Sequence, residues 1–118
     1  MKWNAALMVS YGTPIPGREA KAMETFADAL TIFGKLAADG ECSEPEVFHH
    51  LIGGGMMIVK TETFEMAHEI LDLAEVHKLL DTALLTVLNA DVEIMITGEK
   101  LMSNMTTFTA VGTELTYI

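Results

Sequence analysis

The chain has 118 residues, half of them apolar, and its 7 basic and 17 acidic residues leave a net charge of −10. This length predicts one domain, with roughly two-thirds of the unfolded surface buried on folding. Because proteins hold phosphates through Lys and Arg, so acidic a surface argues against nucleic acid and anionic membranes as partners. No apolar run approaches the roughly 20 residues of a membrane helix. The N-terminus lacks a signal-peptide cleavage pattern and the single Cys42 cannot form an intramolecular disulfide, so a cytoplasmic location is expected.

Residues 3–12, WNAALMVSYG, place their larger apolar side chains at alternate positions, which predicts a first strand. The breaker cluster TPIPG, residues 13–17, predicts a loop. From residue 18 to residue 39 the apolar side chains recur every three or four positions, which predicts a long amphipathic helix that ends before Gly40. Its apolar stripe consists of Met23, Phe26, Leu30, Phe33 and Ala37.

The middle of the chain predicts a hairpin. Residues 42–52 form its first strand, and Pro45 confines that strand to a sheet edge because proline cannot donate a backbone hydrogen bond. The three glycines at 53–55 supply the backbone freedom that a tight turn needs. Residues 56–62 form the second strand of the hairpin.

Helical spacing returns after the hairpin. Thr61 and Thr63 are the candidate N-caps of a second helix, and a further helical stretch covers residues 74–83. Residues 88–97 alternate again and predict a fourth strand. The last twenty residues combine a short helix near residues 101–105 with two extended segments, TTFTAV and ELTYI, which are suited to pairing with a partner subunit.

The order strand, helix, strand, strand, helix, strand is the ferredoxin-like βαββαβ pattern. It predicts an α+β fold with a four-stranded antiparallel sheet and two helices on one face, because right-handed crossovers bring both helices to the same side. The whole chain is expected to form this single domain, with a core of about residues 3–98 and a C-terminal extension of about residues 99–118. The other sheet face carries methionines without a cover, so a homodimer through this open sheet face is expected.

Four stretches carry a resemblance to a known family: SYGTPIPGREAKAMETFADALTIFGKLAADGE, EPEVF, GGGMMIVKTE and AEVHKLLDTALLTVLNADVEIMITGE. In the order of their elements and in their hydrophobic pattern they resemble the dimeric α/β-barrel superfamily, and more narrowly its uncharacterised YciI-like branch. The resemblance covers about residues 5–100. Members of the superfamily include cofactor-free monooxygenases, lactone isomerases, and aldoxime and haem enzymes. The resemblance therefore implies a fold and a cleft between sheet and helices, but no particular reaction.

Two adjacent histidines, His49 and His50, are the candidate catalytic residues. Neighbouring residues on a strand point to opposite faces, so only one of the two can face the cleft, and a metal ion chelated by both is not expected. The inward histidine has the chemistry of a general base or a hydrogen-bond donor, because the ordinary pKa of histidine lies near neutral pH. A solvated or core-satisfied histidine on an edge strand is the simpler alternative.

The ligand-binding residues are expected around the loop at 12–17. Free N–H groups at the start of the following helix, with Arg18 and Lys21 in its first turns, could hold an anionic group, although simple loop closure also accounts for this segment. The three-glycine run lacks the spacing of a phosphate loop and is predicted to be only a turn. The full set of predicted ligand-binding residues is Ser10, Tyr11, Arg18, Met57 and Met95.

These features favour a small dimeric protein that binds a small apolar or aromatic molecule in the cleft, with catalysis left open. One alternative is a cofactor-free enzyme that uses a cleft histidine: a monooxygenase, an isomerase, or a YciI-like hydrolase or lyase. Another is a haem-binding protein, for which His68 and His77 are the histidines predicted on helices. No residue pattern predicts a resident metal ion or another cofactor.

Overall fold

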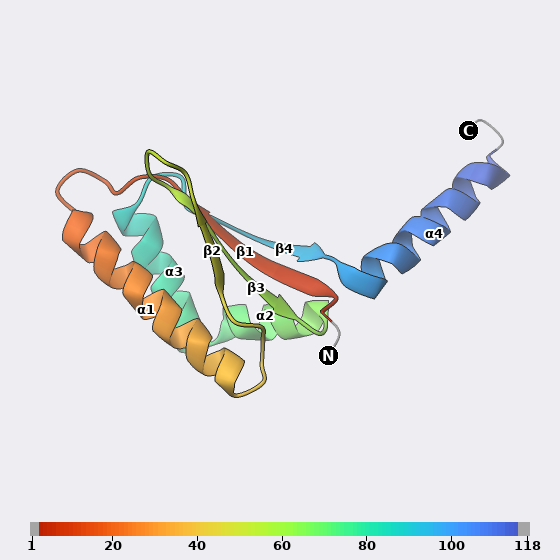
Figure 1. Cartoon of the computed structure of the whole chain (residues 1–118), viewed down its shortest axis with the longest axis horizontal. Helices are drawn as coiled ribbons and strands as arrows, with labels where there is room; N and C mark the ends of the chain where they lie inside the picture. Colours follow the sequence, from red (N-terminus) through yellow and green to blue (C-terminus); the bar gives the residue numbers. More distant parts are fainter. Residues whose placement is uncertain (1–2, 116–118) are drawn as a thin grey trace.

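The computed structural model describes residues 3–115, and Figure 1 shows how they are arranged. Strands and helices follow the predicted order, but residues 64–86 contain two helices and the C-terminal end forms one long helix. The elements are β1 (Ala5–Tyr11), α1 (Glu19–Ala38), β2 (Glu46–His49), β3 (Gly55–Thr61), α2 (Phe64–Asp72), α3 (Ala74–Thr86), β4 (Asp91–Ile96) and α4 (Gly98–Glu114).

The four strands form one antiparallel sheet in the order β2-β3-β1-β4. Helices α1, α2 and α3 lie together on one side of this sheet (Figure 1). This confirms the predicted α+β, ferredoxin-like arrangement. The core lies between the sheet and these helices, where Leu7, Val59, Phe33 and Val76 are each at most 2% exposed.

The long helix α1 forms where the sequence predicts it, but the face that it buries differs from the predicted stripe. Its buried residues are Ala22, Thr25, Phe33 and Leu36. Two members of the predicted stripe are largely outside this face, since Met23 is 66% exposed and Leu30 is 39% exposed. A spacing of three and four leaves two neighbouring stripes on one helix, and the face that α1 buries, where it packs against α3 and the sheet, shares only Phe33 with the predicted stripe.

The hairpin is tighter than predicted. β2 contains only Glu46–His49 instead of residues 42–52, although it is the edge strand that the sequence predicts. The residues after it form the turn: the His50 N–H donates to the Gly54 carbonyl at 2.9 Å, and the Gly53 N–H donates to the His50 carbonyl at 3.2 Å.

Of the two candidate N-caps of the second helix, Thr63 is the cap, because its hydroxyl accepts a hydrogen bond from the Met66 N–H at 3.1 Å, whereas Thr61 ends β3. The helical stretch predicted from residue 74 becomes a separate helix, α3. α2 and α3 meet at Leu73, whose extended backbone turns the chain between them.

Strand pairing decides which methionines face the helices. Met57 lies directly opposite Val9 and is 4% exposed, so both are on the helix-covered face. Met56, its neighbour along the strand, therefore points to the open face, as do Met8 and Met95.

The C-terminal extension contradicts the predicted extended segment. Residues 98–114 form one helix, α4, which includes TTFTAV, whereas ELTYI begins in α4 and ends outside the described residues. No residue of α4 is buried, and the helix projects from the body (Figure 1). The radius of gyration is accordingly 17.0 Å, compared with about 13.5 Å for a compact domain of this length. Among the described residues, no helix combines the length and apolar character needed to cross a membrane.

Candidate functional site

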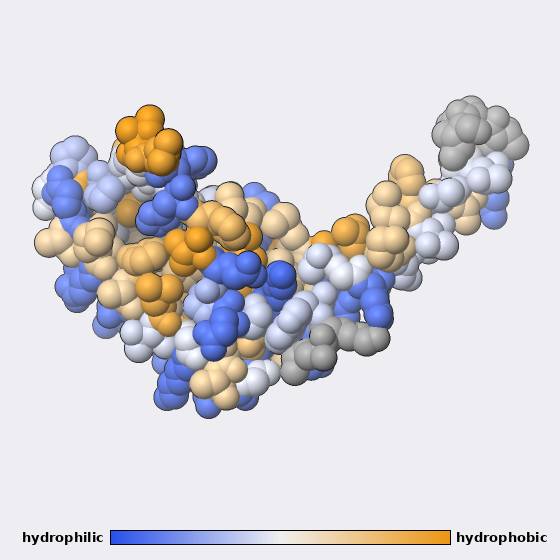
Figure 2. Space-filling view, in the orientation of Figure 1, coloured by the Kyte–Doolittle hydropathy of each residue, from blue (hydrophilic) through white to orange (hydrophobic). Residues whose placement is uncertain are grey.

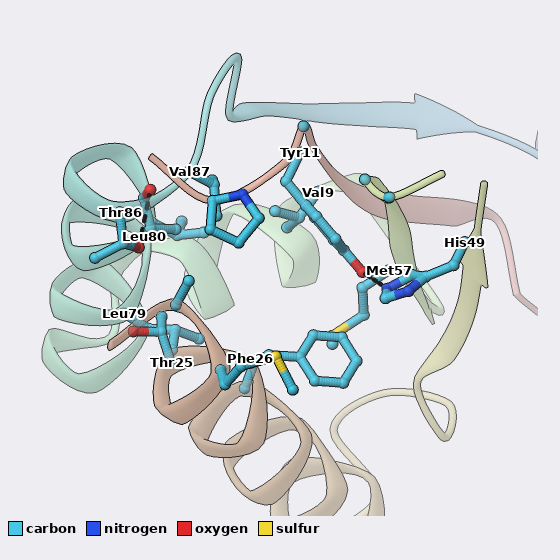
Figure 3. Close-up of a pocket in the computed structure, with 18 of the residues that line it drawn as sticks. Val9, Tyr11, Thr25, Phe26, His49, Met57, Leu79, Leu80, Thr86 and Val87 are labelled. Atoms are coloured by element: carbon cyan, nitrogen blue, oxygen red, sulfur yellow. Dashed lines mark hydrogen bonds between the residues drawn. The ribbon is translucent and has the colours of Figure 1, made fainter. Parts of the chain in front are cut away.

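A cavity of about 300 Å³ opens between the helix-covered face of the sheet and helices α1 and α3. It lies where β1 ends, and Figure 3 shows the side chains that surround it. Its lining is largely apolar and consists of Val9, Tyr11, Gly12, Pro14, Ala22, Met23, Thr25, Phe26, Ala29, Phe33, His49, Gly53, Gly54, Met57, Leu79, Leu80, Ala83, Thr86 and Val87.

One polar pair lies at the edge of this cavity. The Tyr11 hydroxyl and Nε2 of His49 are 2.6 Å apart and hydrogen bond, with the donor set by the tautomer of the imidazole (Figure 3). Phe26 packs against both rings, with centroid distances of 6.3 Å to Tyr11 and 5.5 Å to His49. Burial raises the pKa of the Tyr11 phenol above its ordinary value, so at neutral pH it keeps its proton and can donate or accept.

The two threonines of the lining add little polarity. The Thr25 hydroxyl donates to the Lys21 carbonyl at 2.7 Å, and the Thr86 hydroxyl donates to the Thr82 carbonyl at 2.9 Å. Both donors are therefore used within their own helices. The Tyr11–His49 pair is the main polar feature of a cavity that is otherwise apolar.

Two loop segments close the end of the cavity. The Gly12 N–H donates to the Leu88 carbonyl at 2.7 Å and the Ile15 N–H donates to the Thr86 carbonyl at 2.9 Å, which fixes the loop after β1 against the end of α3. The hairpin turn packs against the end of β1. Gly54 in this turn has a φ of +76°, and a Cβ on it would lie 2.8 Å from the Tyr11 carbonyl. Glycine is thus needed there for both conformation and space.

The structure brings three of the predicted site residues together. Tyr11, His49 and Met57 come from three adjacent strands and all line the cavity. His50 does not line it, and its backbone belongs to the exposed turn. Of the two candidate histidines, the one that faces the cavity is therefore His49.

The other predicted ligand-binding residues lie elsewhere. Ser10 and Met95 are on the open sheet face, opposite the cavity. The Arg18 guanidinium donates to the Leu85 carbonyl near the end of α3, so it joins two helices at the rim and is not in the lining. Ser10 and Tyr11 are neighbours on a strand, so they point to opposite faces of the sheet. Which of the two faces the cavity depends on the strand register, which the sequence does not give.

Several lining residues were missed at the level of sequence. The sequence places Phe26 in the apolar stripe of the helix. Its contact with Tyr11 and His49 could not be predicted, because it depends on the order of the strands in the sheet. Leu79, Leu80 and Ala83 of α3 also line the cavity, and they come from the stretch at 74–83 that the sequence predicts only as helical. Their apolar periodicity marks a buried face, but periodicity does not distinguish a filled core from a cavity wall.

The remaining reactive side chains lie away from the cavity. His68 packs edge-on against Phe64, and Nδ1 of His77 is 3.3 Å from the Asp81 carboxylate, both on exposed helix surfaces. Burial first, and then the nearby Glu41 and Glu44, raise the pKa of the Cys42 thiol to about 11. No group of three potential metal ligands occurs within residues 3–115.

No protein-family model and no curated protein sequence matches the chain. Solved structures with a similar fold include a conserved protein of unknown function from Bacteroides thetaiotaomicron, described as a possible oxidoreductase, with a TM-score of 0.63 and 10% identity over 80% of this chain and 98% of that one. A hydroxynitrile lyase from Passiflora edulis has a TM-score of 0.60 and 11% identity over 81% and 95% of the two chains. A putative antibiotic biosynthesis monooxygenase from Deinococcus radiodurans has a TM-score of 0.59 and 14% identity over 80% and 93%. At such identities the similarity establishes a shared small α/β fold and nothing further.

Proposed function

We propose that the protein binds a small apolar or aromatic molecule in the cavity between the sheet, α1 and α3. The lining carries this proposal, because its threonine donors are already bonded and the Tyr11–His49 pair is its main polar feature. A volume of about 300 Å³ is at the lower end of the range for small-molecule pockets, roughly 300–1,000 Å³. The favoured ligand has an apolar body and one polar group that hydrogen bonds with the pair.

The comparisons support a small-molecule role. One structural neighbour is named as a hydroxynitrile lyase and another as a putative antibiotic biosynthesis monooxygenase. We accordingly place the chain in the dimeric α/β-barrel superfamily as a proposal. Its assignment to the YciI-like branch and its cytoplasmic location stay predictions from the sequence.

The methionines provide a test of binding with internal controls. Met57 and Met23 line the cavity, whereas Met56 and Met95 face the other side of the sheet. In NMR spectra of the protein labelled with methyl-¹³C methionine, saturating p-cresol should shift the signals of Met57 and Met23. The signals of Met56 and Met95 should stay unchanged. Equal shifts at all four positions, or none at the first two, would contradict the proposed site.

A cavity-filling substitution gives an independent check. Ala29 lines the cavity and Ala27, two residues earlier on α1, is exposed. Ala29→Leu should reduce affinity for p-cresol by roughly ten-fold or more because the added carbons occupy the binding volume. Ala27→Leu should bind as the unmodified protein does.

One observation favours catalysis as a second candidate: Nε2 of His49 lies 2.6 Å from the Tyr11 hydroxyl, within reach of a bound molecule. In this role the Tyr11 oxygen takes the proton of the bound molecule while its own proton passes to Nε2 of His49, so His49 is the general base and Tyr11 relays the proton. The test is exchange of a weakly acidic C–H proton of a bound aromatic ketone, such as propiophenone, in D₂O. His49→Gln should abolish the protein-dependent exchange while p-cresol still binds; exchange that survives this substitution would exclude the role.

We also propose that the protein is a homodimer through its open sheet face. The face carries Met8, Met56, Ile58 and Met95 without a covering element among the described residues. An apolar sheet face of this kind usually marks an interface. Sedimentation velocity at micromolar concentration should give the mass of two chains, and a single-chain mass would contradict the proposal.

A further inference from the structure

Helix α4 carries an apolar stripe that stays exposed in the described chain. Its large apolar side chains are between 41% and 72% exposed, and they are Leu101, Met102, Met105, Phe108, Val111 and the C-cap Leu115. Leu101, Met105 and Phe108 follow the spacing of four and three that puts side chains on one helix face. An amphipathic helix needs a surface against which to bury such a face, because propensity alone seldom stabilises an isolated helix of this length.

The first turn of α4 is fixed in a direction that leads away from its own sheet. The Asn4 carbonyl accepts from the Thr97 N–H at 2.8 Å, and Oδ1 of Asn4 accepts from the Lys100 N–H at 3.0 Å. Gly98 between them has a φ of +63°, and a Cβ there would collide with the Trp3 carbonyl. α4 therefore projects from the end of β4 (Figure 1), and folding back onto its own sheet would break this junction.

The open sheet face is the complementary apolar surface. Its apolar side chains are Ala6, Met8, Phe48, Met56, Ile58 and Met95. Its charged side chains are Glu46 on β2, Lys60 on β3, and Asp91 and Glu93 on β4, and Nζ of Lys60 is 3.6 Å from the Glu46 carboxylate. Residues 101–113 of α4 contain no charged side chain, so two chains of net charge −10 can approach here without bringing like charges into contact. Figure 2 shows moderately hydrophobic and weakly hydrophilic surface along the middle of this helix, with strongly hydrophilic residues toward its ends.

The dimensions of the two surfaces agree. α4 has 17 residues, about 25 Å at the helical rise. β1 and β3 have 7 residues each, about 23 Å at the strand rise. A helix about 10 Å wide over this length covers roughly 250 Å². Both surfaces at both sites of a symmetric dimer would then lose roughly 1,000 Å², the lower limit for a specific interface.

We propose that α4 is an exchanged arm: in the homodimer, α4 of each subunit lies on the open sheet face of the other. The similarity to the structural neighbours leaves room for such an arm outside the shared fold. The match to the Bacteroides protein takes in 98% of that chain but 80% of this one, and the remaining fifth is about as long as residues 98–118. The proposal rests on the proposed homodimer and is independent of the proposed ligand.

Cysteine cross-linking between two variants tests the exchange directly. Phe108→Cys places a thiol on the apolar stripe, and Met8→Cys places one at the centre of the sheet face. A mixture of the two purified proteins, after subunit exchange and mild oxidation, should give a disulfide-linked species of two chains. Ser103→Cys, on the opposite side of α4, mixed with Met8→Cys is the control and should give several-fold less. Equal linkage from Ser103→Cys and Phe108→Cys, or none from Phe108→Cys in a dimeric protein, would overturn the arm.

A charge on the stripe gives the second measurement. Phe108→Glu should weaken dimerisation roughly ten-fold or more because the carboxylate would have to be buried. Ser103→Glu adds the same charge to the other side and should leave the dimerisation constant within two-fold of the unmodified value. Because both positions are exposed in the subunit, neither substitution disturbs its core.

Removal of residues 98–118 separates the failure of the arm from the failure of the homodimer. A truncated chain that becomes monomeric supports the arm. A truncated chain that dimerises with unchanged affinity overturns the arm but leaves a sheet-on-sheet homodimer. A full-length chain that is monomeric at micromolar concentration overturns both, and none of these results bears on p-cresol binding in the cavity.

Discussion

At the scale of single residues, the Tyr11 hydroxyl gives the cavity its polar end. Tyr11→Phe removes one hydrogen-bonding group and leaves the aromatic wall, so affinity for p-cresol should fall by roughly five- to ten-fold, the value of about 1 kcal/mol for one hydrogen bond. Benzene, which forms no such bond, should bind with unchanged affinity. Isothermal titration of both probes measures the difference. Thr25→Val is the matched control, because the Thr25 hydroxyl is bonded to the Lys21 carbonyl and should not contribute to binding.

Cys42 belongs to the core and should make stability depend on alkaline pH. Its thiol has a pKa of about 11 in the folded chain, against 9.0 when unperturbed, and the residue is 3% exposed. A raised pKa means that the folded state favours the protonated thiol, so this contribution is complete below pH 9.0 and is lost as the pH rises toward 11. The loss should approach about 2 kcal/mol in the free energy of unfolding.

Denaturant unfolding of the unmodified protein and of Cys42→Ala at several pH values isolates this contribution. The difference between their unfolding free energies should shrink across the alkaline window while other titrating groups cancel. Two curves that stay parallel from neutral pH to pH 11 would show that the thiol does not contribute in this way.

At the scale of elements, the turn of the β2–β3 hairpin should be sensitive to a single methyl group. Gly54→Ala combines a φ of +76° with a Cβ 2.8 Å from the Tyr11 carbonyl. The unfavourable conformation costs about 1–2 kcal/mol, and the displaced turn should also weaken p-cresol binding at the cavity. Gly17→Ala has a φ of +88° with no atom within 4 Å of the added carbon. It should lose only the conformational part and keep full affinity, and equal effects of both substitutions on binding would contradict this account.

Local sequence patterns were sufficient to predict the strands and helices in which buried and exposed positions recur at a regular spacing. Alternation predicted β1 and β4, helical spacing predicted α1, and Thr63 was a correct cap because capping depends on neighbouring residues. The TTFTAV segment failed because its threonines suggested a strand. In α4 each such hydroxyl bonds the carbonyl one turn earlier, as Thr106 does to Met102 at 3.0 Å and Thr109 to Met105 at 3.0 Å. This bonding satisfies the threonine hydroxyls within the helix, so a run of threonines is compatible with α4.

The site was less accessible to sequence reasoning than the fold, because it depends on contacts between distant segments. Tyr11 and His49 are 38 positions apart and meet only because β3 brings β2 beside β1. Alternation establishes that one of His49 and His50 faces the helices, but the choice requires the register. Met57 and Met95 were equivalent by composition, and pairing with Val9 and Ala6 places them on opposite faces.

At the scale of the whole molecule, the charge of the chain and the apolar character of its open surfaces act in opposite directions. The described chain measures 57 × 33 × 23 Å, and its longest dimension includes the projecting α4. Residues 101–113 of α4 carry no charge, and the charged residues of the open sheet face are Glu46, Lys60, Asp91 and Glu93. Association therefore has to overcome a long-range repulsion before it gains short-range apolar contact.

This opposition predicts that salt strengthens the homodimer. Raising the ionic strength from about 0.05 M to about 0.5 M shortens the screening length from more than 10 Å to less than 8 Å. The repulsion between two chains of charge −10 then falls, whereas the uncharged contact of α4 with the sheet has no attraction to lose. The dimerisation constant measured by sedimentation should tighten several-fold over this range. An interface built on complementary charges would weaken instead, and that result would exclude both the sheet face and the arm as its main contact.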